Sequence, residues 1–406
     1  MPTLRDTFSQ LSLLANPVLR TVTVASGVNM FGRSAFLTLT VLFATMRIGL
    51  PAGTTAIILT IANGVGLVTA AIAGHLADRI PTRSMLTVTM AVEGVALCAV
   101  PWAENALALG LVALTFVGAN RATYAARSAT IAYAFNSGNR AGSRAIVKMA
   151  NNAAVAIGSS AAAIPVMLDT TGSYRIAFAV AGCATVTAGV ICRRLPPITS
   201  PARSQLRPAA TPTQSRSPFL DLRYLGVTVL SGLLAMQFGV AEVGVPLWIT
   251  AHTSAPRVLI TLAFAINTVL IVILQLPLSR GTDEVTKAAK VTAYAGALMF
   301  AACAVYALSA VPVAALAAAL LVGAVVCHTL AEIFSSAGTW GLSYELANQS
   351  RAGAYQGVFA MGTALGGMGA PIVSALAVSS GVFGWCALGA VFLLAGLGIR
   401  ALAVIR

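Results

Sequence analysis

The chain has 406 residues, of which 58% are hydrophobic and only 9% are charged, and its mean hydropathy is +0.87. Soluble globular domains carry about 25% charged residues, so this composition excludes that class and indicates a protein whose surface faces lipid. The net charge of +14 is interpreted in the same way, because Lys and Arg mark the cytoplasmic loops of membrane proteins. We therefore expect a lipid bilayer as partner and no nucleic acid.

The apolar segments predict an all-α integral membrane protein with twelve transmembrane helices. A spanning helix needs about 20 mainly apolar residues. Lipid admits only helices and closed barrels, and these continuous apolar runs lack the period-two alternation of a barrel strand. The helices are expected at about 21–46, 53–77, 84–103, 106–132, 145–167, 174–193, 224–250, 257–279, 288–310, 312–337, 353–378 and 380–402.

One long connection divides these helices into two sets of six. Residues 195–223 are rich in Pro and Arg and too poor in apolar side chains to form a core, so they indicate a flexible cytoplasmic linker. The segments 116–119 and 321–324, both ending in Gly-Ala, suggest a weak internal repeat. We predict two six-helix bundles, residues 1–194 and 224–406, related by pseudo-two-fold symmetry, which is a transporter architecture.

The positive charges give the orientation. Most Lys and Arg residues fall on the side of the termini, and the opposite side carries only Arg47, Arg175 and Arg257. Positively charged loops stay in the cytoplasm, so both termini are predicted to be cytoplasmic. We expect a monomeric multi-pass protein of a bacterial inner (plasma) membrane.

The tight connection between the second and third predicted helices carries a recognisable pattern, Gly74-His75-Leu76-Ala77-Asp78-Arg79-Ile80-Pro81-Thr82-Arg83. It resembles the signature G-x-L-a-D-r-x-G-r-[RK] of the major facilitator superfamily, with Pro81 where that family usually has glycine. The resemblance extends over essentially the full chain and implies a secondary transporter.

The resemblance also implies roles for the residues that match. Gly74 would permit close helix contact, and Asp78 would bind the positive N-terminus of the helix that begins near Gly353. Arg79 and Arg83 would hold the cytoplasmic side closed. The equivalent segment of the second half, residues 275–280, lacks the aspartate, so that half is predicted to be unable to form the same contact.

Within the family, the segments 267–277, 331–333 and 355–357 are similar to bacterial exporters of drugs or small metabolites. One departure weakens proton antiport as an expectation. The glycine-rich motif that proton-coupled drug antiporters often carry on helix five is mostly missing from residues 156–165.

Ionisable groups inside a membrane cost about 2.5–3.5 kcal/mol each and mark functional positions. Seven such side chains fall within the predicted helices: Arg33, Glu93, Arg121, Arg127, Glu242, His328 and Glu332. In the family that the chain resembles, helices one, four, seven and ten line the central pathway. All seven except Glu93 lie on those helices.

Three of these residues are expected near the middle of the membrane. Glu93 is predicted to neutralise Arg33 or Arg121, with a purely structural pair as the alternative. The two arginines are candidates for binding an anionic or carbonyl-bearing substrate.

The other four suggest proton transfer and gating. Glu242 is a candidate proton carrier. His328 and Glu332 are four residues apart on one helix face, and form either a proton relay or a local hydrogen bond. Arg127 and Glu332 occupy matched positions in the two halves, which suggests a pair that closes the cytoplasmic mouth.

The expected function is secondary transport of a small molecule by alternating access, most simply proton-coupled efflux of a drug-like compound or secondary metabolite. Neither a phosphate-binding loop nor a metal-ligand cluster is evident, so we expect no cofactor, no enzymatic activity and a proton gradient as the energy source. The alternatives are a facilitator or uptake permease for a polar nutrient, which a cavity rich in Asn, Gln and acidic groups would favour, and a non-transporting membrane sensor on the same fold.

Overall fold

The computed structural model describes residues 12–135, 139–198 and 217–404. Within these ranges the ordered elements are all helical, and twelve helical segments are long and apolar enough to cross a membrane. The predicted all-α class and the predicted number of spans are confirmed. The protein is a multi-pass membrane protein.

The first half contains six spans in chain order. They are α2 (Pro17–Phe43) extended by η2 (Ala44–Ile48), α3 (Ala52–Arg79), α4 (Thr82–Ala99), α5 (Ala106–Ala134), α6 (Arg140–Ala161) extended by α7 (Ala163–Leu168), and α8 (Thr171–Cys192). The short 3-10 turns η1 (Ser12–Ala15) and η3 (Val100–Trp102) precede α2 and follow α4.

The second half contains the other six. The first is built from α10 (Leu222–Ala235), α11 (Gln237–Gly239), η5 (Val240–Gly244) and α12 (Val245–His252). The rest are α13 (Val258–Leu278), α14 (Val285–Leu308), α15 (Ala314–Glu345), α16 (Ala352–Ser379) and α17 (Gly381–Val404), with the turns η4 (Pro218–Leu220) and η6 (Gln349–Arg351). Most of the predicted linker, residues 199–216, lies outside the described residues.

Side-chain caps and prolines explain where several helices begin. Asn16 Oδ1 accepts a hydrogen bond of 2.9 Å from the Val18 amide at the start of α2, and Asn105 does the same for Ala108 in α5. Thr170 and Ser173 form a reciprocal capping box at α8. Such caps satisfy amide groups that have no partner inside the helix, which matters where water is scarce.

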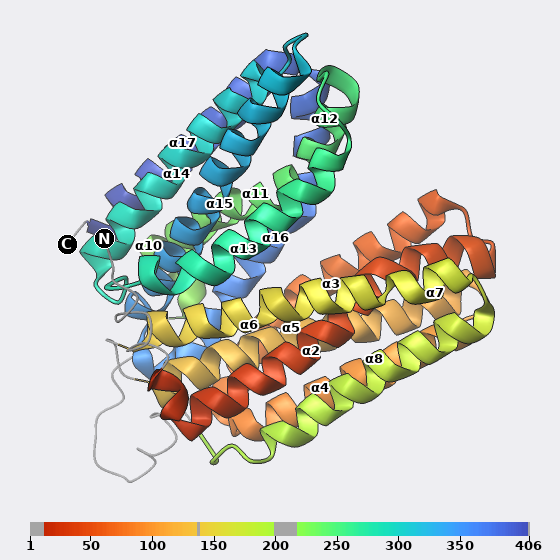
Figure 1. Ribbon diagram of the computed structural model, residues 1–406. Coiled ribbons are helices and arrows are strands. Elements are labelled where there is room, and N and C mark those ends of the chain that lie inside the picture. Colours follow the sequence, from red (N-terminus) through yellow and green to blue (C-terminus); the bar gives the residue numbers. More distant parts are fainter. Residues whose placement is uncertain (1–11, 136–138, 199–216, 405–406) are drawn as a thin grey trace.

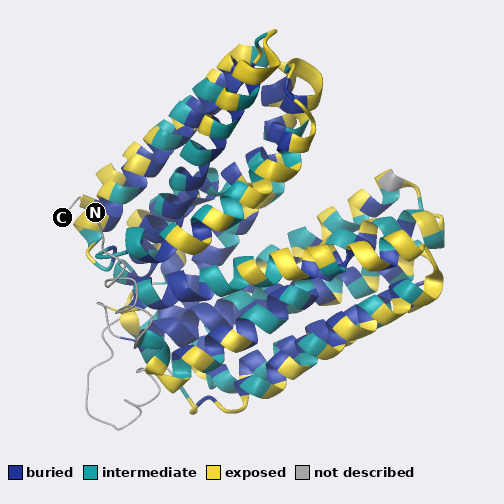
Figure 2. Ribbon diagram, in the orientation of Figure 1, coloured by how far each residue is buried: buried dark blue, intermediate teal, exposed yellow. Residues whose placement is uncertain are grey.

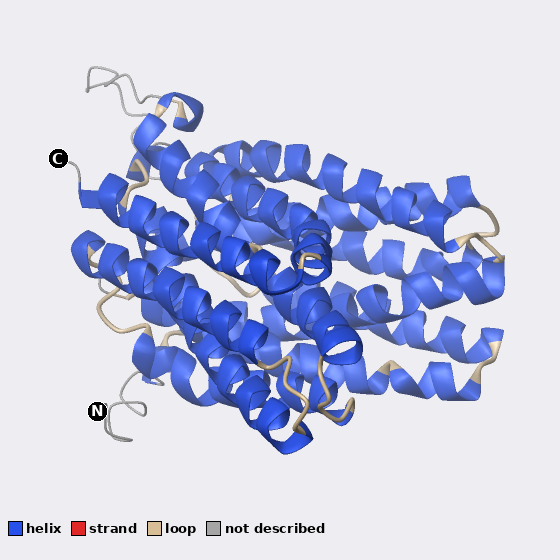
Figure 3. Cartoon of the chain, turned by 90° about the horizontal axis from the view of Figure 1, so that it is seen from above, coloured by secondary structure: helices blue, strands red, loops and turns tan. Residues whose placement is uncertain are grey.

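The two bundles form a V. Figure 1 shows the first half, in red to yellow, and the second, in green to blue, meeting at the end where both termini lie and diverging toward the other. Viewed from above, the same helices run roughly along one direction (Figure 3). Figure 2 shows exposed residues, in yellow, along the outer helices of both bundles. Many exposed side chains are apolar, among them Met167, Leu222 and Phe383, as expected for contact with lipid.

Small residues allow the bundles to approach each other where they meet. α3 packs against α16 and α6 packs against α13. A Cβ atom on Gly74 would lie 2.5 Å from the Gly353 carbonyl oxygen and 2.6 Å from the Gly357 Cα. The close contact predicted for Gly74 is therefore present, and it joins the two halves.

We expect Gly74→Ala to destabilise the protein by roughly 1–3 kcal/mol, because the added methyl group forces the backbones of α3 and α16 apart. Gly64→Ala, in the same helix, is the matched control, because its Cβ would meet nothing within 4 Å. Thermal unfolding of the purified protein in detergent measures both. Equal melting temperatures for the two variants would contradict the role of Gly74.

Candidate functional site

A cavity of about 1330 Å³ lies between the two bundles. Its lining comes mainly from α2, α3, α5 and α6 of the first half, and from the α10–α12 span, α13, α15 and α16 of the second. Helices one, four, seven and ten contribute, as the family resemblance implies, and helices two, five, eight and eleven also do. Both halves therefore contribute to one central site.

The cavity carries more positive than negative charge. Five cationic side chains and two carboxylates line it: Arg33, Arg121, Arg127, Arg144, Lys148, Glu242 and Glu332. His328 lines it as well. Every predicted pathway residue except Glu93 thus reaches the cavity, and Arg144 and Lys148 are additions that the sequence did not reveal.

The predicted neutralisation of an arginine by Glu93 is wrong as a direct contact. The Glu93 carboxylate is fully buried and accepts hydrogen bonds from Asn29 Nδ2 (2.9 Å), Asn120 Nδ2 (3.2 Å) and the Thr123 hydroxyl. The hydrogen bonds of Glu93 thus come from neutral donors. Glu93 acts on Arg33 only electrostatically, without a direct contact.

Arg33 and Arg121 have no carboxylate within 4 Å among the described residues. Arg121 donates to Asn63 Oδ1 at 3.2 Å, and Gly66 leaves room for its side chain on the facing helix α3. Arg33 approaches only the Met30 sulfur, at 4.0 Å. Both guanidinium groups therefore retain hydrogen-bonding capacity for a ligand.

Glu332 pairs with Lys148 and not with Arg127, so the predicted gate pair is wrong. Lys148 Nζ lies 2.8 Å from Glu332 Oε1 and 2.9 Å from Ser336 Oγ. Asn267 donates to the second carboxylate oxygen at 3.0 Å. This buried ion pair connects α6 of the first half to α15 of the second. Sequence reasoning missed it because Lys148 was counted among the cytoplasmic charges near the helix start.

Arg127 and Arg144 lie with Tyr124 and Trp340. Arg144 is enclosed by the two rings, with its guanidinium carbon 4.9 Å from each centroid, and it donates to Ser128 Oγ and the Tyr124 hydroxyl. The guanidinium of Arg127 lies 5.4 Å from the Tyr124 ring. Its Nε and Nη1 atoms are buried and have no hydrogen-bond partner.

His328 and Glu242 remain candidates for different reasons. The Nδ1 atom of His328 lies 3.3 Å from the Tyr306 hydroxyl, and within the described part of the chain no hydrogen bond joins it to Glu332, so the predicted local His–Glu bond is absent. Glu242 lies in the π-helical turn η5, exposed to the cavity, and interacts electrostatically with Arg33.

At the junction of the bundles, the contact predicted for Asp78 is present. Its two carboxylate oxygens accept hydrogen bonds from the Gly353 amide at 2.7 Å and the Ala354 amide at 3.0 Å, at the start of α16. The Tyr133 hydroxyl also bonds to Asp78. A carboxylate at a helix N-terminus is favoured by both the free amides and the helix dipole.

Of the two arginines in the same segment, Arg83 differs from the expectation, and the role of Arg79 stays a prediction. Arg83 donates to the Leu195 carbonyl at 3.4 Å, which keeps it within its own half. It does not hold the two halves together, because its partner belongs to the same bundle. Arg79 is the last residue of α3.

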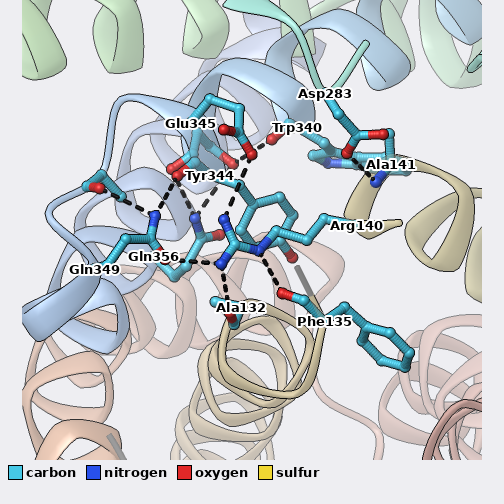
Figure 4. Close-up of polar contacts among 12 residues, drawn as sticks. Ala132, Phe135, Arg140, Ala141, Asp283, Trp340, Tyr344, Glu345, Gln349 and Gln356 are labelled. Carbon is cyan, nitrogen blue, oxygen red and sulfur yellow. Dashed lines mark hydrogen bonds and ion pairs between the residues drawn. The ribbon is translucent and has the colours of Figure 1, made fainter. Parts of the chain in front are cut away.

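The second half has an equivalent aspartate, which corrects the prediction that it cannot form such a contact. Asp283 Oδ1 accepts a hydrogen bond of 2.9 Å from the Ala141 amide, at the start of α6 (Figure 4). The aspartate lies a few residues beyond the segment compared in the sequence, in the turn after α13. Each half thus caps a helix of the other with an aspartate, Asp78 from the last turn of α3 and Asp283 from the turn after α13.

Arg140 reinforces this second contact (Figure 4). It donates to the carbonyls of Ala132 and Phe135 at 2.9 Å each, and to Gln349 Oε1 at 2.8 Å. It also pairs with Glu345 at 3.4 Å. The guanidinium therefore joins the end of α5 to the end of α15 across the junction.

Burial raises the pKa of the Asp283 carboxyl above its usual 3.8, against the opposing effects of the Ala141 amide and the Arg140 charge. The folded state then binds this proton more tightly than the unfolded state. Its contribution to stability is therefore largest below about pH 4 and falls as the pH rises through the raised pKa.

We expect the melting temperature of Asp283→Asn, relative to wild type, to rise between about pH 4 and about pH 7, because the amide does not titrate. The neighbouring exposed residue Glu284 supplies the control variant Glu284→Gln. A constant difference in melting temperature between wild type and Asp283→Asn across this pH range would contradict the raised pKa of Asp283.

Comparisons with known proteins agree with this architecture. The model of the Major Facilitator Superfamily matches residues 22–371. Similar crystal structures include the human organic anion transporter MFSD10 (TM-score 0.73, 12% identity, covering 94% of this chain and 98% of that one). A bacterial homologue of the iron transporter ferroportin in an outward-facing state has a TM-score of 0.73 and 13% identity, covering 95% of this chain and 98% of that one. The transporter FucP in the outward conformation has a TM-score of 0.68 and 12% identity, covering 95% of this chain and 97% of that one.

At these identities the crystal structures show a shared fold. A search of curated protein sequences finds no significant match. The family model covers most of the chain, and the helices, junction and central cavity have the arrangement described above. The chain therefore belongs to the Major Facilitator Superfamily and is a membrane transporter of small molecules, not an enzyme.

Proposed function

We propose that the protein is a proton-linked secondary transporter of small amphipathic organic anions, working by alternating access. The observation that carries this proposal is the charge of the cavity, with five cationic side chains against two carboxylates. An excess of positive charge repels organic cations and attracts anions, and the effect is strong where water is partly excluded.

Arg33 and Arg121 are the candidates for direct contact with the anion. Neither has a carboxylate partner among the described residues, and removing a charge from water without a partner is costly. A bound carboxylate or sulfonate would supply the missing partner, and a hydrogen bond to a charged group contributes about 1.5–3 kcal/mol. The arginines therefore favour anionic substrates over neutral ones.

The apolar part of the cavity supports an amphipathic molecule. Met30, Phe238, Phe264 and Trp340 line it together with the charged groups. With the termini in the cytoplasm, the junction lies at the inner side of a bacterial plasma membrane and the cavity opens outward. An exporter of drug-like or metabolite anions would release its substrate from this state.

Proton coupling is assigned to Glu332 and Glu242. The Lys148–Glu332 pair joins the two halves, so it has to break before the halves can separate at the junction end. Protonation of Glu332 removes the charge that holds Lys148 and would favour this separation. Glu242, in the same cavity, is a second group able to accept the proton.

Uptake of a polar anionic nutrient is the second candidate function. Seven amide side chains line the cavity, as a permease for a polar molecule requires: Asn29, Asn63, Asn120, Asn151, Asn152, Gln237 and Asn267. Protonation of a carboxylate makes the cavity more positive, so a bound proton raises the affinity of the cavity for the anion. This linkage favours symport, in which the proton and the anion move in the same direction.

We expect Lys148→Met and Glu332→Gln each to lower stability, by about 3–5 kcal/mol where the remaining charge stays buried without its partner. The exchanged pair Lys148→Glu with Glu332→Lys should recover part of this loss and part of the transport rate. Asp169→Asn, which breaks the more exposed Arg47–Asp169 pair, is the control and should change stability by no more than about 1 kcal/mol. A double variant less stable than both single ones would contradict the pairing.

In proteoliposomes with an imposed pH gradient, we expect saturable transport of naphthalene-2-sulfonate and none of the equally shaped cation 2-naphthyltrimethylammonium. Arg33→Gln or Arg121→Gln should raise KM for the anion about tenfold, through loss of one charged hydrogen bond. Anion accumulation on the acidic side indicates proton antiport, and accumulation on the alkaline side indicates symport. Equal rates for anion and cation would refute the proposal.

A further inference from the structure

Besides Arg33 and Arg121, the cavity contains a further cation without an anionic partner among the described residues, Arg127, at its closed end. We propose that Arg127, supported by Arg144, forms a second anion-binding position, so that the substrate is an aromatic molecule with two acidic groups. This inference rests on the proposed anion transport and specifies the substrate class. The proposed partner of Arg127 is an acidic group of the substrate, whereas the sequence predicted Glu332, which is bound to Lys148.

Arg127 is a buried guanidinium with unused donors. Only 4% of the residue is exposed, yet it lines the cavity. Its Nε and Nη1 atoms have no hydrogen-bond partner, and no carboxylate lies within 4 Å among the described residues. A buried cation of this kind is unfavourable unless something neutralises it. An acidic group bound from the cavity side would do so.

The neighbouring groups leave this position to a ligand. Glu93 attracts Arg127 electrostatically, but its oxygens are occupied by Asn29, Asn120 and Thr123. Glu332 is bound to Lys148. Arg144 adds a second positive charge beside Arg127, and the two repel each other until an anion joins them.

The distance from the first anion position follows from the helix. Arg121 and Arg127 both lie on α5, which continues without a break from Ala106 to Ala134. Six residues along an α-helix correspond to about 9 Å. Arg33 lies close enough to repel both Arg121 and Arg127 electrostatically. The cavity therefore offers two cationic positions separated along its axis.

Two aromatic side chains line the cavity beside the second position. Tyr124 is midway between Arg121 and Arg127 on α5 and lines the cavity. Trp340 lines the cavity as well and lies against Arg144. The faces of these rings contact Arg127, Arg144 and Lys148, so they offer a planar ligand edge-to-face contact, which aromatic pairs also favour. The combination of two separated cationic positions and adjacent rings fits a planar core with an acidic group at each end.

The test compares two ligands of matched shape, naphthalene-2-sulfonate and naphthalene-2,6-disulfonate, both permanently charged. Binding is measured as the ligand concentration that half-maximally raises the melting temperature of the purified full-length protein, at constant ionic strength. For wild type, the disulfonate should act at about tenfold lower concentration, the equivalent of one further charged hydrogen bond. Arg127→Gln should abolish this preference, so that the two ligands act at about equal concentrations.

Arg127→Lys keeps the positive charge without the paired N–H donors and should retain part of the preference for the disulfonate. It is the control in case the glutamine variant does not fold. Without ligand, Arg127→Gln should be at least as stable as wild type, because it removes an unpaired buried charge. Equal half-maximal concentrations for the two ligands in wild type would overturn this inference and leave the proposed anion transport intact. A tenfold preference that persists in Arg127→Gln would also overturn it, and a lack of response to either ligand would overturn both.

Discussion

The arrangement of the two halves depends on two aspartates, each bound to the N-terminus of a helix in the opposite bundle. Asp78 accepts hydrogen bonds from the first amides of α16, and Asp283 accepts one from the first turn of α6. The free amides at a helix N-terminus attract a carboxylate, and glycines at positions 74, 353 and 357 let the backbones come close enough for the first contact to form. Because both contacts lie at one end of the molecule, the bundles diverge at the other, and the cavity is the consequence.

The same geometry explains why charge is concentrated where it is. Inside the first bundle the buried carboxylate of Glu93 is satisfied by neutral neighbours, two asparagines and a threonine. Arg33, Arg121 and Arg127, which have no carboxylate within 4 Å among the described residues, lie along the wall between the bundles, where a ligand or water can reach them. The Lys148–Glu332 pair is different, because its two members come from different halves. It is stable only while the halves remain together, and so its strength is coupled to the conformation of the transporter.

The candidate site was partly visible in the sequence. Intramembrane charge is expensive in lipid, so each such residue in a predicted span was a reasonable candidate, and Arg33, Arg121, Arg127, Glu242, His328 and Glu332 all line the cavity. Their partners were not visible. Matched positions in the two halves suggested Arg127 and Glu332 as a pair, but the carboxylate contacts Lys148, because α6 also crosses the interface. Asp283 was missed because the comparison of the halves ended at residue 280, whereas the turn after α13 places the aspartate beyond it.

The sequence alone determined the fold class and the number of spans, and the family resemblance of a local motif implied the contact of Asp78 with the helix near Gly353. Those features depend on apolar length, on helix-breaking residues and on a local motif, and all three are properties of consecutive residues. Only the tertiary structure decided which charges are paired, that Glu93 is satisfied by neutral donors, and that Arg127 is left without an anion. Pairing depends on which faces of separate helices meet, and no pattern within one helix specifies its neighbour's rotation or depth.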